Sequence, residues 1–244
     1  MKQRQEIILL PQVCNYYNMK LTILSIPFLC VVLFCNSISA QTSGVKTEST
    51  EAKAKANSEI EKKAAEWVDS LRLSDPSKAA RVKAVIAEHL KTIRDWNNEH
   101  PFTTVPAGIN PATGNKLSDL DRQIIASSAM PESVHKNLME GLHKDLTPDQ
   151  IEFILDQYTI GKVAFTLKGY KAIVPDLKAE EEAVILKNLK QAREQAVDYK
   201  SMKQISAIFE IYKTKCEQYL NSNGRNWKQL FKDYVTARKA EKGK

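Results

Sequence analysis

The sequence predicts an all-α protein, a single helical bundle of about seven or eight helices with one irregular glycine-containing segment at residues 160–175. Apolar residues recur at intervals of three and four along most of the chain, which places them on one face of an α-helix. Two capping boxes, Thr147–Gln150 and Ser201–Gln204, mark helix starts, because each satisfies two orphan backbone N–H groups. These two observations predict the fold class.

Residues 1–40 have the composition of an N-terminal extension followed by a cleaved signal peptide. Lys20 precedes the apolar run Leu21–Cys35, and small residues at 36–40 precede a predicted cut before Gln41. The apolar run is shorter than the roughly 20 residues that span a bilayer. We therefore expect a periplasmic or secreted protein with no stable membrane insertion after cleavage. An uncleaved anchor is the alternative, and either Met1 or Met19 can be the start.

Residues 41–57 show no apolar period and are predicted to be a flexible tether. A single all-α domain is expected over residues 58–240. Its first helix begins at the start of that range, and Ser74-Asp75-Pro76 ends it and starts the second, with proline at the first helical position. The second helix ends before Pro101, since the residue preceding a proline is pushed out of the α region. Clustered glycines and prolines then predict a loop at residues 102–116.

The remaining chain keeps the helical rhythm apart from one break. Gly161, Gly169 and the β-leaning run Val163–Leu167 predict the irregular segment, which Pro175 ends. Helices are predicted on both sides of it, over residues 117–128, from Pro131, from Thr147 to about residue 160, over 178–198 and 201–220, and from Trp227.

Composition limits the classes of function. The formal net charge is +7, and the predicted leader carries three basic residues and one acidic residue, which leaves +5. Acidic and basic residues alternate, as in residues 178–195, so no nucleic-acid partner is expected. Removing the leader leaves Cys216 as the single cysteine. It lies on a predicted apolar helix face, so we expect a buried, inert thiol and no intrachain disulfide.

The familiar catalytic patterns are absent from the sequence: there is no HExxH, GxSxG, CxxC or glycine-rich phosphate loop. His135 and His143 lie about two turns apart, but no acid or cysteine completes a zinc site beside them. No metal and no cofactor is therefore predicted. Enzymes that work through two carboxylates have no fixed spacing between them, so an enzymatic function stays open.

The candidate ligand-binding residues are aromatic and polar side chains near helix ends: Trp96, Asn97, His100, Tyr158, Thr166, Lys168 and Tyr170. Aromatic rings offer apolar faces to sugar rings, and amides, hydroxyls and amines bond to sugar hydroxyls. The alternative for aromatics at helical spacing is a place in the core. For the helix end at His100 the alternative is ordinary C-capping.

Three blocks, Lys62–Pro101, Leu146–Tyr199 and Ile211–Trp227, resemble a secreted domain-of-unknown-function family of glycan-degrading Gram-negative bacteria. The resemblance extends over about Glu61 to Ala237. Sugar binding has been suggested for that family, which has no established catalytic residues, so none is carried over. This chain departs from the family in the loop at residues 102–116, which is longer than usual.

The resemblance and the aromatic residues predict an exported accessory protein that binds carbohydrate in a polysaccharide-degradation system. One alternative is a glycan-active lyase or hydrolase without a recognisable motif. Another is a periplasmic chaperone, since Leu146–Gln150 matches the LTxxQ motif of small helical chaperones. Those chaperones usually carry the motif twice, and a capping box explains the single copy here. The sequence determines neither the glycan nor the oligomeric state.

Overall fold

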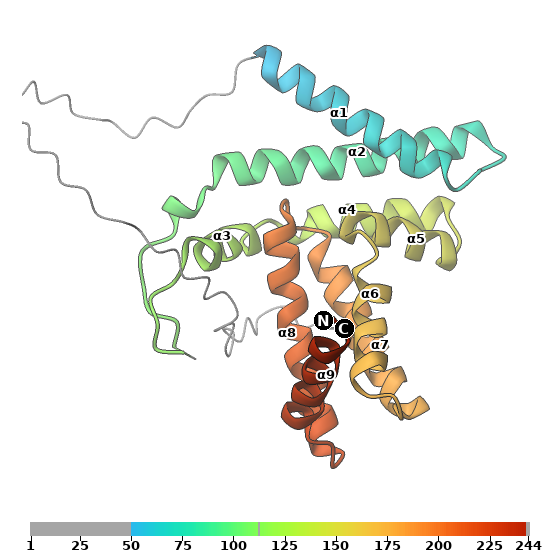
Figure 1. Ribbon diagram of the computed structural model, residues 1–244. Coiled ribbons are helices and arrows are strands. Elements are labelled where there is room, and N and C mark those ends of the chain that lie inside the picture. Colours follow the sequence, from blue (N-terminus) through green and yellow to red (C-terminus); the bar gives the residue numbers. More distant parts are fainter. Residues whose placement is uncertain (1–49, 112, 243–244) are drawn as a thin grey trace, which may run out of the picture.

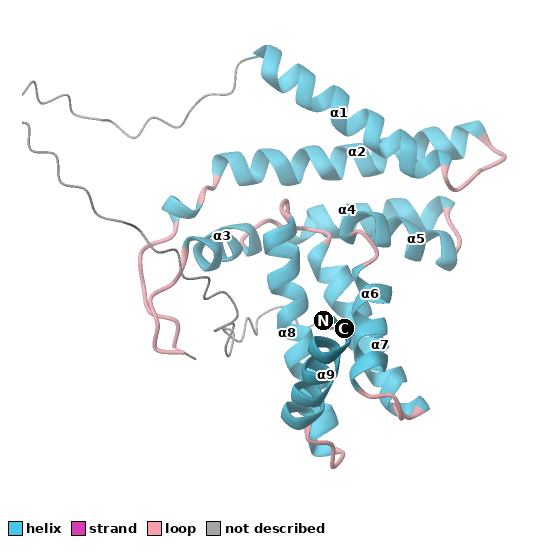
Figure 2. Ribbon diagram, viewed as in Figure 1, coloured by secondary structure: helices cyan, strands magenta, loops and turns pink. Residues whose placement is uncertain are grey.

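The computed structural model describes residues 50–111 and 113–242, and within them the protein is built from helices and loops (Figure 2). The only β feature of these residues is an isolated antiparallel bridge between Ile109 and Lys116. The helices are α1 (Thr50–Asp69), α2 (Pro76–Glu99), the 3-10 turn η1 (Phe102–Thr104), α3 (Asp119–Ser128), α4 (Glu132–Asp145), α5 (Pro148–Thr159), α6 (Lys162–Ile173), α7 (Ala179–Ala196), α8 (Met202–Ser222) and α9 (Trp227–Lys242). The all-α prediction is confirmed, with nine α-helices in the described residues.

The helix starts that the sequence predicts form as expected. The Asp75 carboxylate accepts hydrogen bonds from the backbone N–H groups of Ser77 and Lys78 at the start of α2. Both capping boxes are present. In the first, Gln150 N–H donates to the Thr147 hydroxyl at 3.4 Å, and Thr147 N–H donates to the Gln150 side chain at 3.0 Å. The LTxxQ sequence is therefore fully explained by its hydrogen bonds at the start of α5.

The helices form two groups that cross each other (Figure 1). In the first group α1 packs along α2, which lies on α4, with α5 beside α4. Their facing residues form one core cluster, which includes Trp67, Ile86, Leu142 and Ile154. The second group stands across the first and is centred on α7 packed against α8, with α6 and α9 alongside. Its core includes buried Ile185, Leu189, Phe209, Cys216 and Leu220.

Cys216 is fully buried in this second core, as predicted. Burial raises the pKa of its thiol to about 12, so the reactive thiolate is suppressed at neutral pH. None of the described helices is both long and apolar enough to cross a bilayer.

The predicted irregular segment at 160–175 is wrong, because residues 162–173 form the regular helix α6. This is the helix that the sequence prediction omitted. The break is confined to Ile160 and Gly161, whose φ angles of 53° and 63° are left-handed. Val163 and Tyr170 are buried against the second core, so tertiary packing overrides the β preference of the run at 163–167.

The first helix begins earlier than predicted, at Thr50, so residues 50–57 of the expected tether are helical. These residues are mostly alanine, lysine and glutamate, which favour helix even without an apolar stripe. The predicted signal peptide and residues 41–49 of the tether lie outside the described residues.

The close approach of α4 to α2 generates a stability prediction. A Cβ atom on Gly141 would lie 2.6 Å from a methyl group of Val85, whereas a Cβ on Gly169 in α6 would meet nothing within 4 Å. We expect Gly141→Ala to lower the free energy of unfolding by about 1–3 kcal/mol through overpacking. Gly169→Ala, the matched control, should raise it by up to about 1 kcal/mol through helix propensity. Urea denaturation followed by circular dichroism measures both, and equal effects of the two variants would refute the assignment.

Candidate functional site

The structure places the sequence-predicted ligand residues on or at the end of three different helices, α2, α5 (Pro148–Thr159) and α6. Trp96, Asn97 and His100 lie at the C-terminal end of α2. Tyr158 lies in the first core cluster and Tyr170 in the second. Thr166 and Lys168 lie on α6, where Thr166 is half-buried and Lys168 is exposed. These seven residues therefore do not line one common cavity.

The two tyrosines are core residues, which corrects the prediction that they face a ligand. Tyr158 is 8% exposed, its ring packs 4.9 Å from that of Trp67, and its hydroxyl lies 3.2 Å from His89 Nδ1. Tyr170 is 2% exposed, and its hydroxyl donates to the backbone carbonyl of Lys213 at 3.1 Å. Burial raises the pKa of both phenols above its ordinary value, so both stay protonated. Helical spacing of aromatics indicates the core at these positions.

The end of α2 is capped by its own residues. The His100 backbone N–H donates to the Trp96 carbonyl at 2.8 Å, and His100 Nδ1 lies 3.0 Å from the same oxygen. The imidazole stacks on the Trp96 indole with ring centroids 3.8 Å apart. The indole N–H in turn donates to the carbonyl of Ala126 at 3.0 Å. His100 therefore caps the helix and covers one face of Trp96.

Asn97 joins three helices instead of facing solvent. Its amide N–H donates to the Ile93 carbonyl at 2.9 Å. Its side-chain oxygen accepts from Gln123 on α3 at 3.3 Å and from Gln204 on α8 at 3.4 Å. These hydrogen bonds within α2 and to α3 and α8 satisfy the polar atoms of the Asn97 amide, so its position is explained without a ligand.

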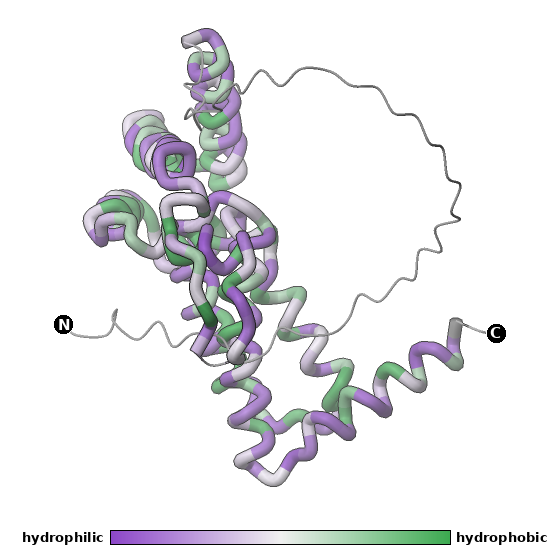
Figure 3. Tube along the Cα trace, turned by 90° about the vertical axis from the view of Figure 1, so that its left-hand side faces the viewer, coloured by the Kyte–Doolittle hydropathy of each residue, from purple (hydrophilic) through white to green (hydrophobic). Residues whose placement is uncertain are grey.

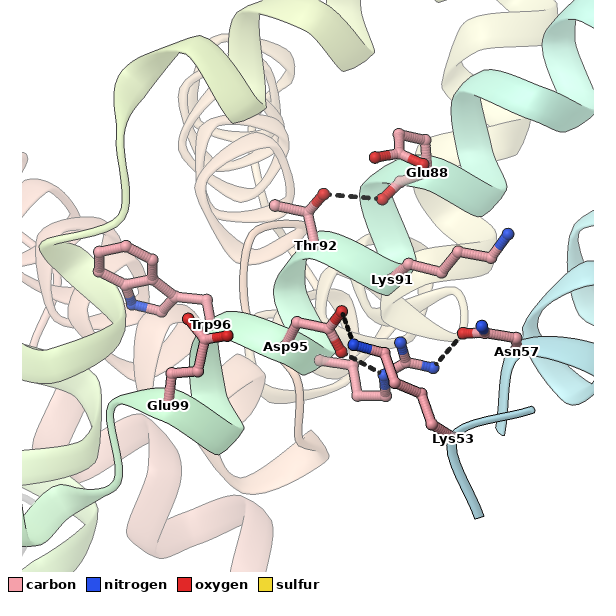
Figure 4. Close-up of a pocket in the computed structure, with 9 residues that line it drawn as sticks. Lys53, Asn57, Glu88, Lys91, Thr92, Asp95, Trp96 and Glu99 are labelled. Carbon is pink, nitrogen blue, oxygen red and sulfur yellow. Dashed lines mark hydrogen bonds and ion pairs between the residues drawn. The ribbon is translucent and has the colours of Figure 1, made fainter. Parts of the chain in front are cut away.

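An open depression of about 310 Å³ lies beside Trp96, between α1 and α2 (Figure 4). Of the sequence-predicted residues, only Trp96 lines it. Trp96 and Glu99 stand at one end of the view, and Lys53 and Asn57 stand at the other. The full lining is Lys53 and Asn57 from α1 with Glu88, Lys91, Thr92, Arg94, Asp95, Trp96 and Glu99 from α2. The volume falls at the lower end of the range of small-ligand sites, about 300–1,000 Å³.

The charged groups of the depression hold one another in place. Arg94 donates to Asp95 and to the Asn57 side-chain oxygen, each at 2.7 Å, and Lys53 Nζ lies 3.3 Å from Asp95. Lys91 donates to Glu61 at 2.5 Å. The hydrogen bond from Arg94 holds the pKa of the Asp95 carboxyl below its usual range. The depression thus presents an ionised carboxylate and cations in fixed positions, which suits the binding of a ligand with many hydroxyl groups.

Sequence reasoning missed Lys53 and Asn57 because the first helix was expected to start after them. A usable signal was present on α2. Glu88, Thr92, Asp95 and Glu99 recur at intervals of four and three, so they form a polar stripe beside the apolar one. The depression forms only where α1 packs beside α2, so the polar stripe of α2 alone does not predict it.

A second polar cluster lies at the crossing of the two helix groups. The Asp198 carboxylate, in the turn after α7, lies 3.1 Å from His89 Nε2 on α2 and 3.0 Å from His135 Nδ1 on α4. His89 Nδ1 faces the Tyr158 hydroxyl on α5, which donates to it when the imidazole is neutral. Burial opposes ionisation of Asp198, but the hydrogen bonds from His135 and His89 outweigh it and hold the pKa of the carboxyl below its usual range. No group of His, Cys, Asp and Glu residues in the described part of the chain is arranged to hold a metal ion.

Asp198 generates a prediction about pH. Because its folded pKa lies below the unfolded value of about 3.9, its stabilisation is present above that pH and is lost as the pH falls through the folded pKa. We expect Asp198→Asn to lower the free energy of unfolding by about 2 kcal/mol at neutral pH, and the difference from the parent protein should shrink below about pH 4. Exposed Asp233→Asn is the control, with little change at any pH. If Asp198→Asn lowered the free energy of unfolding by the same amount at acid and neutral pH, stabilisation by the ionised carboxylate would be contradicted.

Comparison with known proteins places the chain in a family. No match was found among curated proteins. A family model described as Protein of unknown function (DUF3826) matches residues 57–240. The match begins inside α1 and ends inside α9, so it includes both core clusters and nearly all of the depression lining. The resemblance to a domain-of-unknown-function family is therefore confirmed, while its link to glycan degradation and sugar binding stays a prediction. Because the match covers most of the sequence, the chain belongs to the DUF3826 family.

Proposed function

We propose that this protein is an exported accessory protein that binds carbohydrate in a polysaccharide-degradation system, and that the depression beside Trp96 is its binding site. The observation that carries the proposal is the depression itself: hydrogen-bonding groups from two helices converge on a concave surface of small-ligand size. The lining includes Asp95, whose carboxylate is held by Arg94 and Lys53.

Pre-positioned polar groups are what recognition of a sugar requires. Each sugar hydroxyl both donates and accepts hydrogen bonds, and it pairs well with an ionised carboxylate or an amide that is already oriented. Arg94 is largely buried and fixes both Asp95 and the Asn57 side chain, so little rotational freedom is lost when a ligand binds. Glu88 and Glu99 are exposed on the same stripe of α2 and supply further acceptors.

The charge pairing in the depression favours a neutral sugar over an acidic one. Lys53 and Arg94 are paired with Asp95, and Lys91 is paired with Glu61. A uronic acid or a sulfated sugar would have to compete with these carboxylates for the same cations. Neutral hydroxyls can bond to the remaining lone pairs and N–H groups without breaking the pairs.

Calorimetric titration with a panel of neutral oligosaccharides tests the proposal. We expect measurable binding to at least one of them and weaker binding to its acidic counterpart. Asp95→Asn should reduce the affinity about tenfold, because a hydrogen bond to a charged group is lost. Glu140→Gln, at an exposed position of α4, is the matched control and should leave the affinity unchanged. The absence of heat with every oligosaccharide, or equal affinities of the two variants, would reject the site.

A product assay separates binding from cleavage. A binding protein releases no reducing ends and no unsaturated products from crude polysaccharide, whereas the alternative lyase or hydrolase releases one or the other. Product formation that Asp95→Asn abolishes would assign catalysis to the depression and replace the binding role.

A further inference from the structure

The positive charge of this protein is concentrated in its C-terminal part. Residues 162–244 carry 18 Lys and Arg against 10 Asp and Glu, whereas residues 1–161 carry 18 against 19. The whole excess of +7 therefore belongs to the part of the chain that begins with α6. Within it, α6 has three lysines and no acid, and α9 has five basic residues against two acidic ones. Opposite charges are interleaved along α7 within this part, so its positive excess is concentrated on α6 and α9.

Large exposed apolar side chains gather in the same part of the fold. Of the five that are strongly exposed in the described residues, Phe165 on α6 is the most exposed at 78%, and Ile160 directly before α6 follows at 72%. Phe231 on α9 is a third, at 36%. A phenylalanine this exposed contributes little to the core, so its ring is available for a contact outside the chain.

The outer face of α6 combines both features. Ala164, Phe165, Lys168, Lys171 and Ala172 are all exposed, and they share the side of the helix opposite buried Val163 and Tyr170. Lys168 makes no ion pair among the described residues, while Lys171 Nζ lies 2.6 Å from Glu182. An aromatic ring flanked by small residues and lysines, without any acid on the helix, is the composition of an interfacial helix face.

The neighbouring α9 adds to the positive excess of α6. It packs on α6 and α8, with the Tyr170 and Trp227 rings 5.1 Å apart, and its C-terminal part runs outward from the other helices (Figure 3). The start of α9 therefore brings Lys228 close to α6, and exposed charges act on one another over about one Debye length, roughly 8 Å at physiological salt.

We propose that the outer face of α6 docks peripherally on an anionic lipid bilayer, with Phe165 entering the headgroup region and Lys168 pairing with lipid phosphates. Charge complementarity selects an anionic partner, and the exposed aromatic ring selects a bilayer over a soluble polyanion, which offers no apolar layer. A second copy of this chain docked on the same face would bring the α6 lysines of the two copies together, and their like charges would repel. The contact is a surface association and is separate from the sugar-binding depression on α2.

Co-sedimentation of the purified protein with vesicles tests the docking. We expect binding to phosphatidylcholine vesicles that contain phosphatidylglycerol, no binding to phosphatidylcholine alone, and release at high salt. Lys168→Glu should weaken the partition about tenfold or more, since each basic residue near an anionic surface contributes about a factor of five. Phe165→Ser should weaken it about tenfold by removing the buried ring.

Two matched variants serve as controls. Lys55→Glu on α1 changes the same net charge, and Ile109→Ser removes an apolar side chain that is 61% exposed in the loop after η1. Both should bind vesicles like the parent protein, and circular dichroism confirms that all four variants are folded. Equal binding to neutral and anionic vesicles, an unaffected Phe165→Ser variant, or binding to dextran sulfate without binding to vesicles would each overturn the proposal.

Discussion

One largely buried carboxylate joins the two helix groups. Asp198 follows α7 and is bonded to His89 of α2 and His135 of α4, and through His89 it is linked to Tyr158 of α5. An ionised group at this depth is stable only when hydrogen bonds replace its lost hydration. Both histidines therefore stabilise the carboxylate, and their hydrogen bonds tie the turn after α7 to α2 and α4.

The helix α2 contributes to the first core and to the depression, and its C-terminal end also contacts helices outside the first group. Its apolar stripe packs on α1 and α4, and Asn97 at its end binds α3 and α8. The remaining face carries the polar stripe that lines the depression with α1. Because α2 is held along its whole length, the polar side chains of this stripe project from a rigid backbone. This rigidity is what a pre-organised ligand site needs.

The two proposed surfaces lie on different helix groups and differ in charge. In the depression, cations and carboxylates are paired, so the net field is small and hydroxyl groups are the natural ligands. On α6 and α9 the cations outnumber the acids, and the field is positive. A protein that holds a neutral glycan on one side and a negatively charged bilayer on another would keep the glycan close to the cell surface. The two surfaces share no residue.

Sequence alone determined the helical class, the helix starts and the buried cysteine, because capping boxes and apolar stripes act within a few residues. It also pointed to Trp96, one of the depression-lining residues. It missed α6, since the burial of Val163 and Tyr170 against distant helices outweighs the local β preference and the glycines. It placed both tyrosines in a site, although their hydroxyls bond to His89 and to the Lys213 carbonyl far along the chain. Only the tertiary structure decides which faces of amphipathic helices are covered, because the covering helices are distant in the sequence and no local pattern identifies them.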